Sequence, residues 1–242
     1  MAIPRLYCPQ PIAPGDALVL PDVLAHHVRV LRLAEGDSVV LFDGRGGEIA
    51  ATLAFEGKSA RAVLGTRSDR EAELAGRMTL LQGIPAGDKM DWIVEKAVEL
   101  GVCRLQPVAA RRSVTQLSGS RLDKRMLHWQ RIIAAASEQC GRNRLMHLDR
   151  PRTLAETLSP PGPDPRFLCD PAAPVDLATA LSRTGSPGGV ELMVGPEGGW
   201  DEEELAIARH AGVDAVRFGS RVLRTETAGL ALIAAATALL GW

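Results

Sequence analysis

The chain has 242 residues, of which 46% are hydrophobic and 24% are charged, and its formal net charge is −1. These values are ordinary for a globular protein, so they exclude a largely disordered or low-complexity chain. A chain of this length forms either one large domain or two smaller ones, and either arrangement can bury a full core.

The N-terminal sequence and the cysteines bear on the location of the protein. The start, MAIPRLYCPQP, has prolines where a secretory signal requires an unbroken apolar stretch, so we expect a cytoplasmic protein. The four cysteines are widely separated and none belongs to a C-x-x-C pair: Cys8, Cys103, Cys140 and Cys169. They predict neither a zinc site nor a disulfide framework, and we expect no bound metal.

The first part of the chain is rich in β-strand patterns. The spacing of Leu24, Val28 and Leu31 predicts a helix over residues 22–33. Three β-type runs follow, SVVLF, GEIAATLAF and KSARAVLG, separated by the turn signals Asp-Gly and Glu-Gly. The polar stretch 67–76 has no strand pattern. It predicts a boundary between a first domain of residues 1–70 and a second of residues 76–242.

In the second domain strands and helices alternate, which is typical of a parallel α/β sheet. Strand patterns occur at MTLLQGI, CRLQPV, RFLCD, VELMV and AVRF, and helices are predicted over residues 88–100 and 201–211. A further helix is predicted to begin with Ser120 and Asp123 as an N-terminal cap and to end at Gly141. Its apolar stripe is Leu122, Met126, Trp129, Ile133 and Ala136.

The C-terminal stretch, residues 227–242, carries no charge. It is shorter than the roughly 20 residues that span a bilayer, so we do not expect a membrane segment. Its Ala and Leu content predicts a helix, and a helix that is apolar on every side is normally buried in a core or an interface. We therefore expect this helix to contribute to a homodimer interface.

Charge is distributed unevenly along the chain. Between Arg104 and Arg152 there are eleven Arg and Lys residues against three acidic residues. Such a segment suits phosphate, and a solvated helix face with flanking loops is the alternative explanation. Arg111 and Arg112 follow a predicted strand and precede a predicted helix, so we expect them to project from a loop that phosphate can reach.

Two glycine-containing segments follow predicted strands. In the first, VELMV ends in Gly195-Pro196-Glu197-Gly198-Gly199, at the sheet edge where α/β proteins bind ligands. Glycines there expose backbone N–H and C=O groups to a ligand. The segment is neither a dinucleotide fingerprint nor a P-loop.

The second segment, RFGSRVLRTETAG at 217–229, leads into the apolar C-terminal helix. Thr225 is predicted to cap this helix, and Glu226 suits its positive end. Arg221 and Arg224 are not explained by capping, because cations are disfavoured at a helix N-terminus. The pair therefore indicates an anionic partner.

Together these motifs resemble the ribosomal RNA uridine N3-methyltransferases of the RsmE type, which are S-adenosylmethionine enzymes of the SPOUT class. The resemblance covers nearly the whole chain in six ordered segments: HHVRVLRLAEGD, EKAVELGV, RRS, EQCGR, GPEGGW and RVLRTETA. The family commonly has Leu-Gly-Pro where this chain has Phe218-Gly219-Ser220.

The resemblance implies a PUA-like β-barrel followed by a C-terminal α/β domain, a SPOUT-type parallel sheet tied in a trefoil knot. It implies a homodimer that uses S-adenosylmethionine to methylate N3 of a specific uridine in small-subunit (16S) ribosomal RNA, free or in the assembled subunit. The implied catalytic residues are Arg224, as a stabiliser of developing negative charge, and Glu138, as a proton acceptor. The cofactor-binding residues are Val194, Gly195, Glu197, Gly198, Gly199, Phe218, Gly219 and Leu223, and the RNA-binding residues are His27, Arg29, Arg32, Arg111, Arg112 and Arg142.

Two other functions stay open at this stage. The first is a non-catalytic RNA-binding factor in ribosome assembly, which would use the β-barrel and the basic segment alone. The second is a small-molecule α/β enzyme that binds another nucleotide and needs no structured RNA. The intact glycine-rich and RVLRTETA motifs argue against the assembly factor.

Overall fold

A computed structural model of the chain describes residues 3–12, 15, 17–57, 59–159 and 162–242. Its internal contacts divide the chain into two compact units, one formed by residues 1–73 and 134–145 and the other by residues 74–133 and 146–242. The segment 134–145 lies inside the predicted second domain, yet its contacts are with the first unit.

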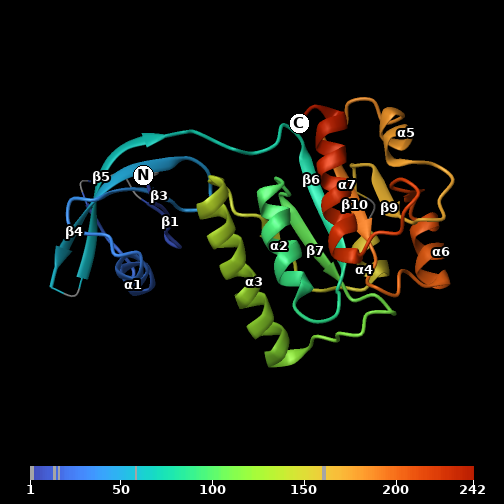
Figure 1. Ribbon diagram of the computed structural model, residues 1–242, viewed down its shortest axis with the longest axis horizontal. Helices are drawn as coiled ribbons and strands as arrows, with labels where there is room; N and C mark the ends of the chain where they lie inside the picture. Colours follow the sequence, from blue (N-terminus) through green and yellow to red (C-terminus); the bar gives the residue numbers. More distant parts are fainter. Residues whose placement is uncertain (1–2, 13–14, 16, 58, 160–161) are drawn as a thin grey trace. The chain divides into compact units, whose positions relative to one another are not determined.

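The first unit is built on a five-stranded mixed sheet in the order β1-β3-β4-β5-β2 (Figure 1). Its strands are β1 (Arg5–Tyr7), β2 (Ala17–Val19), β3 (Ser38–Phe42), β4 (Glu48–Glu56) and β5 (Ser59–Ser68). β1 and β3 are parallel, whereas the β3–β4, β4–β5 and β2–β5 pairs are antiparallel. The three predicted β runs are therefore strands β3 to β5, whereas β1 and β2 were too short to be recognised.

Helix α1 (Asp22–Val30) buries Leu24 and Val28 in the core of the first unit, as predicted from their spacing. The helix ends earlier than predicted because Arg32 adopts a left-handed backbone conformation with φ +57°. The N–H groups of Arg32 and Leu33 turn back to the carbonyls of Arg29 and Val28, which closes the last turn. Leu31 lies beyond the helix and is 44% exposed, so its predicted place in the apolar stripe is wrong.

Polar contacts explain why residues 134–145 belong to the first unit. Glu48 accepts hydrogen bonds from Arg5 at 2.6 Å and from the side chain of Asn143 at 3.2 Å. Arg5 also donates to Asn143. The guanidinium of Arg142 makes two hydrogen bonds to Glu73, at 3.0 and 2.6 Å. Arg5 and Glu48 lie 43 residues apart in the sequence, and the other pairs lie further apart. No local pattern therefore predicts these contacts.

The second unit contains a six-stranded sheet in the order β11-β9-β10-β6-β7-β8, and every pair in it is parallel (Figure 1). The strands are β6 (Arg77–Gly83), β7 (Arg104–Val108), β8 (His147–Leu148), β9 (Arg166–Cys169), β10 (Gly189–Val194) and β11 (Asp214–Val216). The helices are α2 (Lys89–Glu99), α3 (Gly119–Cys140), α4 (Leu154–Leu158), α5 (Leu177–Ser182), α6 (Glu202–His210) and α7 (Thr225–Leu240). Helix α3 belongs to this unit up to residue 133, and its last residues belong to the first unit. The predicted parallel α/β sheet is confirmed.

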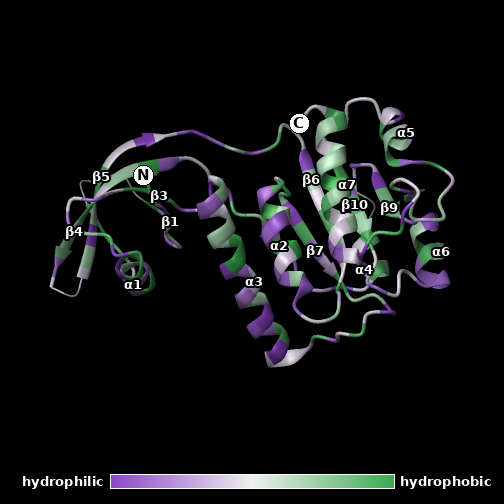
Figure 2. Cartoon of the chain, viewed as in Figure 1, coloured by the Kyte–Doolittle hydropathy of each residue, from purple (hydrophilic) through white to green (hydrophobic). Residues whose placement is uncertain are grey.

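Helices cover both faces of this sheet, which is why its central strands are apolar without alternation. Successive residues of β6 point to opposite faces: Leu80 lies near Gly229 of α7, whereas Leu81 joins a core cluster that includes residues of α4 and α6. Figure 2 shows α7 as mainly hydrophobic along its length. Among the described residues, no helix is long and apolar enough to cross a membrane.

Helix α3 has the predicted buried stripe and the predicted end. Its five stripe residues are all buried, and Gly141 follows the last helical residue with φ +85°. Its start differs from the prediction, because the helix begins at Gly119 and Ser120 is already inside it. The helices α4 and α5 were not predicted; they have five and six residues and carry too little periodicity to detect.

Candidate functional site

A pocket of about 550 Å³ lies at the carboxyl edge of the parallel sheet in the second unit. Three chain segments meet there: the ends of β9 and β10 with the loops that follow them, and residues 218–225, which lead into α7. The lining residues include Lys89, Asp170, Val194, Gly195, Glu197, Gly199, Trp200, Phe218, Arg221, Leu223, Arg224 and Thr225. Parallel α/β sheets bind ligands at this edge.

The glycine-rich turn after β10 is packed closely on its neighbours. A Cβ atom on Gly83, at the end of β6, would lie 2.5 Å from Cδ of Pro196 and 2.6 Å from its nitrogen. A Cβ on Gly195 would lie 3.1 Å from Cα of Gly199. These approaches explain why glycine stands at both positions, and they bring backbone groups rather than side chains to the pocket wall.

Thr225 joins this turn to the second segment. Its hydroxyl donates to the carbonyl oxygen of Gly195 at 2.6 Å and accepts from the side-chain amide of the buried Gln82 at 2.9 Å. The prediction that Thr225 caps α7 is therefore wrong: the N-cap position is Arg224, and it makes no side-chain capping bond. The hydroxyl is used for tertiary contact because Thr225 is already the first helical residue.

Glu197 is held at the pocket by α2 and its preceding loop. Lys89 donates to it at 2.6 Å, and the N–H of Ala86 lies 3.2 Å from each carboxylate oxygen. Burial raises the pKa of Glu197, but the hydrogen bonds from Lys89 and from backbone N–H groups outweigh burial and lower the pKa below its ordinary value. The carboxylate therefore stays ionised at neutral pH. Lys89 also lies 3.8 Å from Glu226 at the start of α7.

The pocket carries two guanidinium groups, those of Arg221 and Arg224. Within the described part of the chain, no carboxylate lies within ion-pair distance of either one. Arg217 differs from them, because it donates to the carbonyl oxygens of Ala173 and Pro174 and so anchors the start of the segment. Arg221 and Arg224 therefore offer positive charge to an anionic group in the pocket.

Most of the predicted cofactor-binding residues come together in this pocket. Val194, Gly195, Glu197, Gly199, Phe218 and Leu223 line it, whereas Gly198 and Gly219 do not. Sequence reasoning did not single out Lys89, Asp170 and Trp200, which also line it. For Asp170 a signal was present, since it follows the strand pattern RFLC at the same sheet edge.

The predicted RNA-binding arginines of the second unit lie in two different environments. Arg111 is exposed and pairs with Glu203 at 2.5 Å. Arg112 is exposed as well, but it donates to the carbonyl of Gly198 at 3.0 Å and so touches the glycine-rich turn. Both side chains are exposed, as expected of a loop, but only that of Arg112 is also bonded to the glycine-rich turn.

The remaining predicted site residues belong to the first unit. Arg142 is 2% exposed and bonded to Glu73, so it is a structural arginine whose charge does not reach solvent, contrary to the expected contact with RNA. Arg29 and Arg32 are exposed and His27 is half-buried on α1 and the residues just after it. Glu138 accepts a hydrogen bond from the N–H of Tyr7 at 2.7 Å and is not among the residues that line the pocket.

Comparison with known proteins decides the family. Residues 72–237 match the family model of an RNA methyltransferase domain, and residues 20–63 match that of an RNA methyltransferase PUA domain. A ribosomal RNA small subunit methyltransferase E from Synechocystis sp. is 31% identical over 99% of this chain and 78% of its own length. The chain belongs to the ribosomal RNA small subunit methyltransferase E family.

Solved structures of this family share the whole fold. A ribosomal RNA small subunit methyltransferase E from Neisseria gonorrhoeae, crystallised with S-adenosylmethionine, has a TM-score of 0.90, 36% identity and 98% coverage of both chains. A methyltransferase from Legionella pneumophila in complex with the same cofactor has a TM-score of 0.91, 29% identity and 98% coverage of both chains. The expected PUA-like domain and SPOUT-type α/β domain of this methyltransferase are thereby confirmed. The threading of the knot stays a prediction.

Proposed function

We propose that this protein transfers a methyl group from S-adenosylmethionine to N3 of a specific uridine in 16S ribosomal RNA. The observation that supports it most directly is the pocket at the sheet edge, in a chain of the ribosomal RNA small subunit methyltransferase E family. Its volume of about 550 Å³ suits a small molecule such as S-adenosylmethionine, since small-molecule pockets typically range from about 300 to 1,000 Å³. Exposed backbone groups of the glycine-rich turn suit the adenine edge, and the carboxylates of Asp170 and Glu197 suit hydroxyl or ammonium groups.

When bound, S-adenosylmethionine would supply an electrophilic methyl group, whose bond to sulfur would break and leave its electron pair on the sulfur. Uridine N3 carries a proton, so the new N–CH₃ bond requires that this proton leave to a base or to water. Negative charge grows on the uracil ring as the proton leaves. Arg224, which lines the pocket and has no carboxylate partner among the described residues, is positioned to stabilise that charge. The target base must be turned out of its stack to reach the pocket.

We retain Glu138 as the candidate proton acceptor. Burial raises its pKa above the ordinary value, although the N–H of Tyr7 and the nearby charges of His27 and Arg5 oppose this effect. A carboxyl group whose pKa is raised holds an accepted proton more firmly than an ordinary carboxylate does.

The proposed assembly is a homodimer in which α7 takes part. In this chain one side of α7 packs on β6, β10, α2 and α5, and its buried residues include Leu232 and Ile233. The other side keeps exposed apolar surface, with Leu239 at 55%. Contact with a second copy would cover that surface. The proposed ribosomal RNA substrate also supports a cytoplasmic location.

Methyl transfer from radiolabelled S-adenosylmethionine to in vitro transcribed 16S RNA, and to small subunits rebuilt from it, tests the proposal. Mass mapping of the labelled nucleotide then identifies the base and the atom. We expect a single uridine carrying one methyl at N3. Tight RNA binding without transfer would favour the assembly factor, and transfer to a free nucleoside or nucleotide alone would favour a small-molecule enzyme.

A further inference from the structure

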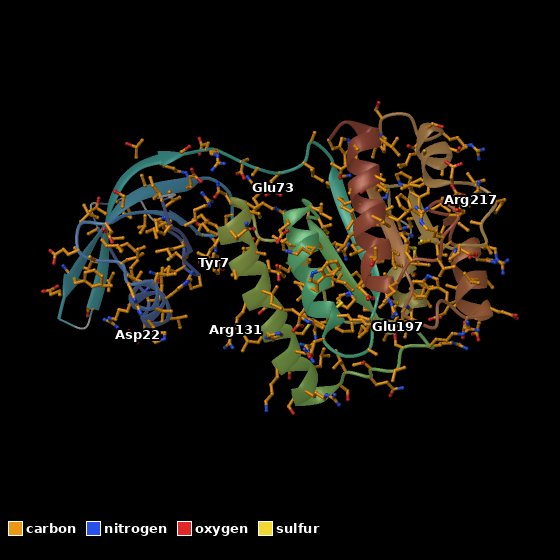
Figure 3. All side chains as sticks on the ribbon, viewed as in Figure 1. Tyr7, Asp22, Glu73, Arg131, Glu197 and Arg217 are labelled. Atoms are coloured by element: carbon orange, nitrogen blue, oxygen red, sulfur yellow. The ribbon has the colours of Figure 1, made fainter. Side chains whose placement is uncertain are left out.

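Helix α3 carries a row of basic side chains on the side opposite its buried stripe. Arg121, Lys124, His128 and Arg131 follow one another at intervals of three, four and three residues, so they lie on one face of the helix. All four are exposed, whereas Leu122, Met126 and Trp129 of the opposite face are buried. In Figure 3, Arg131 lies on the side of α3 away from α2.

Three of these four side chains, those of Arg121, Lys124 and Arg131, are cations that lack a counter-charge. Among the described residues, no carboxylate lies within 4.0 Å of Arg121, Lys124 or Arg131. His128 is different, since its ring is bonded to Asp91 at 2.7 Å, and the neighbouring Arg125 pairs with Asp88 and Asp91. The acid on the adjacent face, Asp123, is already paired with Arg150.

The first turn of α3 contains no acidic residue, although the N-terminal end of a helix favours negative charge. Arg121 instead places a cation close to that end. Figure 2 shows the N-terminal half of α3 as predominantly hydrophilic. An external anion at this position would be attracted both by the unpaired side chains and by the helix end.

We propose that Arg121, Lys124 and Arg131 form a basic track that binds the sugar–phosphate backbone of the ribosomal RNA beyond the target nucleotide. The inference rests on the proposed function, which supplies the RNA. The ten residue steps from Arg121 to Arg131 span about 15 Å, enough to follow several consecutive phosphates. The only Trp of α3, Trp129, is buried, and the exposed ring of His128 is already bonded to Asp91, so the track contributes affinity and orientation without reading bases.

The test replaces the three residues together, Arg121→Gln, Lys124→Gln and Arg131→Gln. Glutamine keeps helix propensity and removes charge, so the fold is retained. With in vitro transcribed 16S RNA as the probe, the slope of log affinity against log salt should become shallower by about 2 to 2.7, at about 0.7 to 0.9 per phosphate contact. The KM for RNA in methyl transfer should rise, whereas kcat at saturating RNA and the Kd for S-adenosylmethionine should stay unchanged.

A matched control removes three other exposed cations of the second unit, by Arg152→Gln, Arg183→Gln and Arg209→Gln. It changes the net charge equally and should leave the salt slope near that of the wild type. Equal flattening by both triple variants would overturn the basic track, because net charge alone would then explain the effect. An unchanged slope in the α3 variant would overturn it too.

Two further outcomes separate this inference from the proposed function. In the first outcome, the wild-type protein methylates no RNA, but the salt slope of RNA binding is shallower in the α3 variant. This result would refute the proposed function and support the basic track. Polyglutamate serves as the competing acidic polypeptide. If it fails to displace bound RNA, RNA is the partner of the α3 face. If it binds the α3 face as strongly as RNA at equal charge, the partner is a protein and the basic track is refuted.

Discussion

The hydroxyl of Thr225, at the start of α7, donates to the carbonyl oxygen of Gly195, at the end of β10, across 2.6 Å. The two residues belong to two of the three segments that form the pocket, and they lie 30 positions apart. This hydrogen bond holds the segments together without using a backbone group of the later one. The oxygen of Gly195 is thereby fixed in direction before any ligand binds.

Replacing Thr225 by Val keeps the shape of the side chain and removes this hydrogen bond. We expect the free energy of unfolding to fall by about 1 to 3 kcal/mol, because the buried carbonyl of Gly195 loses its partner. Binding of S-adenosylmethionine should weaken, measured by calorimetry. Thr225→Ser should restore most of both quantities. Thr227→Val, at an exposed position of the same helix, should change neither.

Gly198 is closely approached by Arg112, although it does not line the pocket. A Cβ atom there would lie 3.0 Å from Cβ of Arg112, so Gly198→Val should displace the glycine-rich turn and abolish binding of S-adenosylmethionine. Gly188→Ala is the control, since the nearest atoms to its added Cβ lie 3.8 Å away on the flexible end of Arg77. A folded Gly198→Val protein with wild-type affinity would contradict the expectation.

Single replacements of Arg111 and Arg112 by Ala should have different effects on the binding of S-adenosylmethionine. Arg111→Ala should leave the Kd for S-adenosylmethionine unchanged, because Arg111 pairs with Glu203 on the surface. Arg112→Ala should raise that Kd several-fold, because the carbonyl of Gly198 loses its donor. If either arginine binds phosphate, its variant should make the salt slope of RNA binding shallower by about 0.7 to 0.9.

Glu138→Gln tests the proton acceptor and the stability at once. The folded-state pKa of Glu138 is raised by burial, so the native state binds its proton more tightly than the unfolded state does. The associated stability is present below the ordinary pKa of 4.5 and is lost as the pH rises through the raised value. The amide oxygen of Gln can still accept from Tyr7. We expect the variant to unfold with less pH dependence in urea titrations from acidic to neutral pH, and to methylate RNA more slowly. Full activity would exclude Glu138 as the base.

Leu239→Asp should convert the proposed dimer to a monomer, as measured by light scattering, because Leu239 is 55% exposed on this chain. Leu232 is unsuitable for that test: it is fully buried in the core of the second unit, so Leu232→Asp should unfold the protein whatever its assembly. A folded, dimeric Leu239→Asp protein would move the interface away from this end of α7.

The sequence predicted the features that depend on local pattern. The β runs, the parallel strands and the buried stripe of α3 are all periodic, and the glycine-rich turn follows a recognisable strand. Contacts between distant positions left no such trace. The Thr225 hydroxyl was assigned to a cap because Thr commonly caps helices, whereas its partner was Gly195. The family resemblance implied an RNA contact for Arg142, whereas its partner Glu73 lies 69 positions away and no local pattern predicts that pair.

Residues 134–145 complete the first unit only after the chain has passed through residues 74–133 of the second. During synthesis, Arg5 and Glu48 are therefore made before their partner Asn143. At a synthesis rate of about 5 to 20 residues per second, the 72 residues from 74 to 145 take roughly 4 to 14 s. A nascent chain that stops at residue 70 leaves these charged groups without their late partner. We expect such a fragment to be poorly folded and prone to aggregate. The PUA-like domain therefore cannot be transferred to another protein as one continuous segment of sequence.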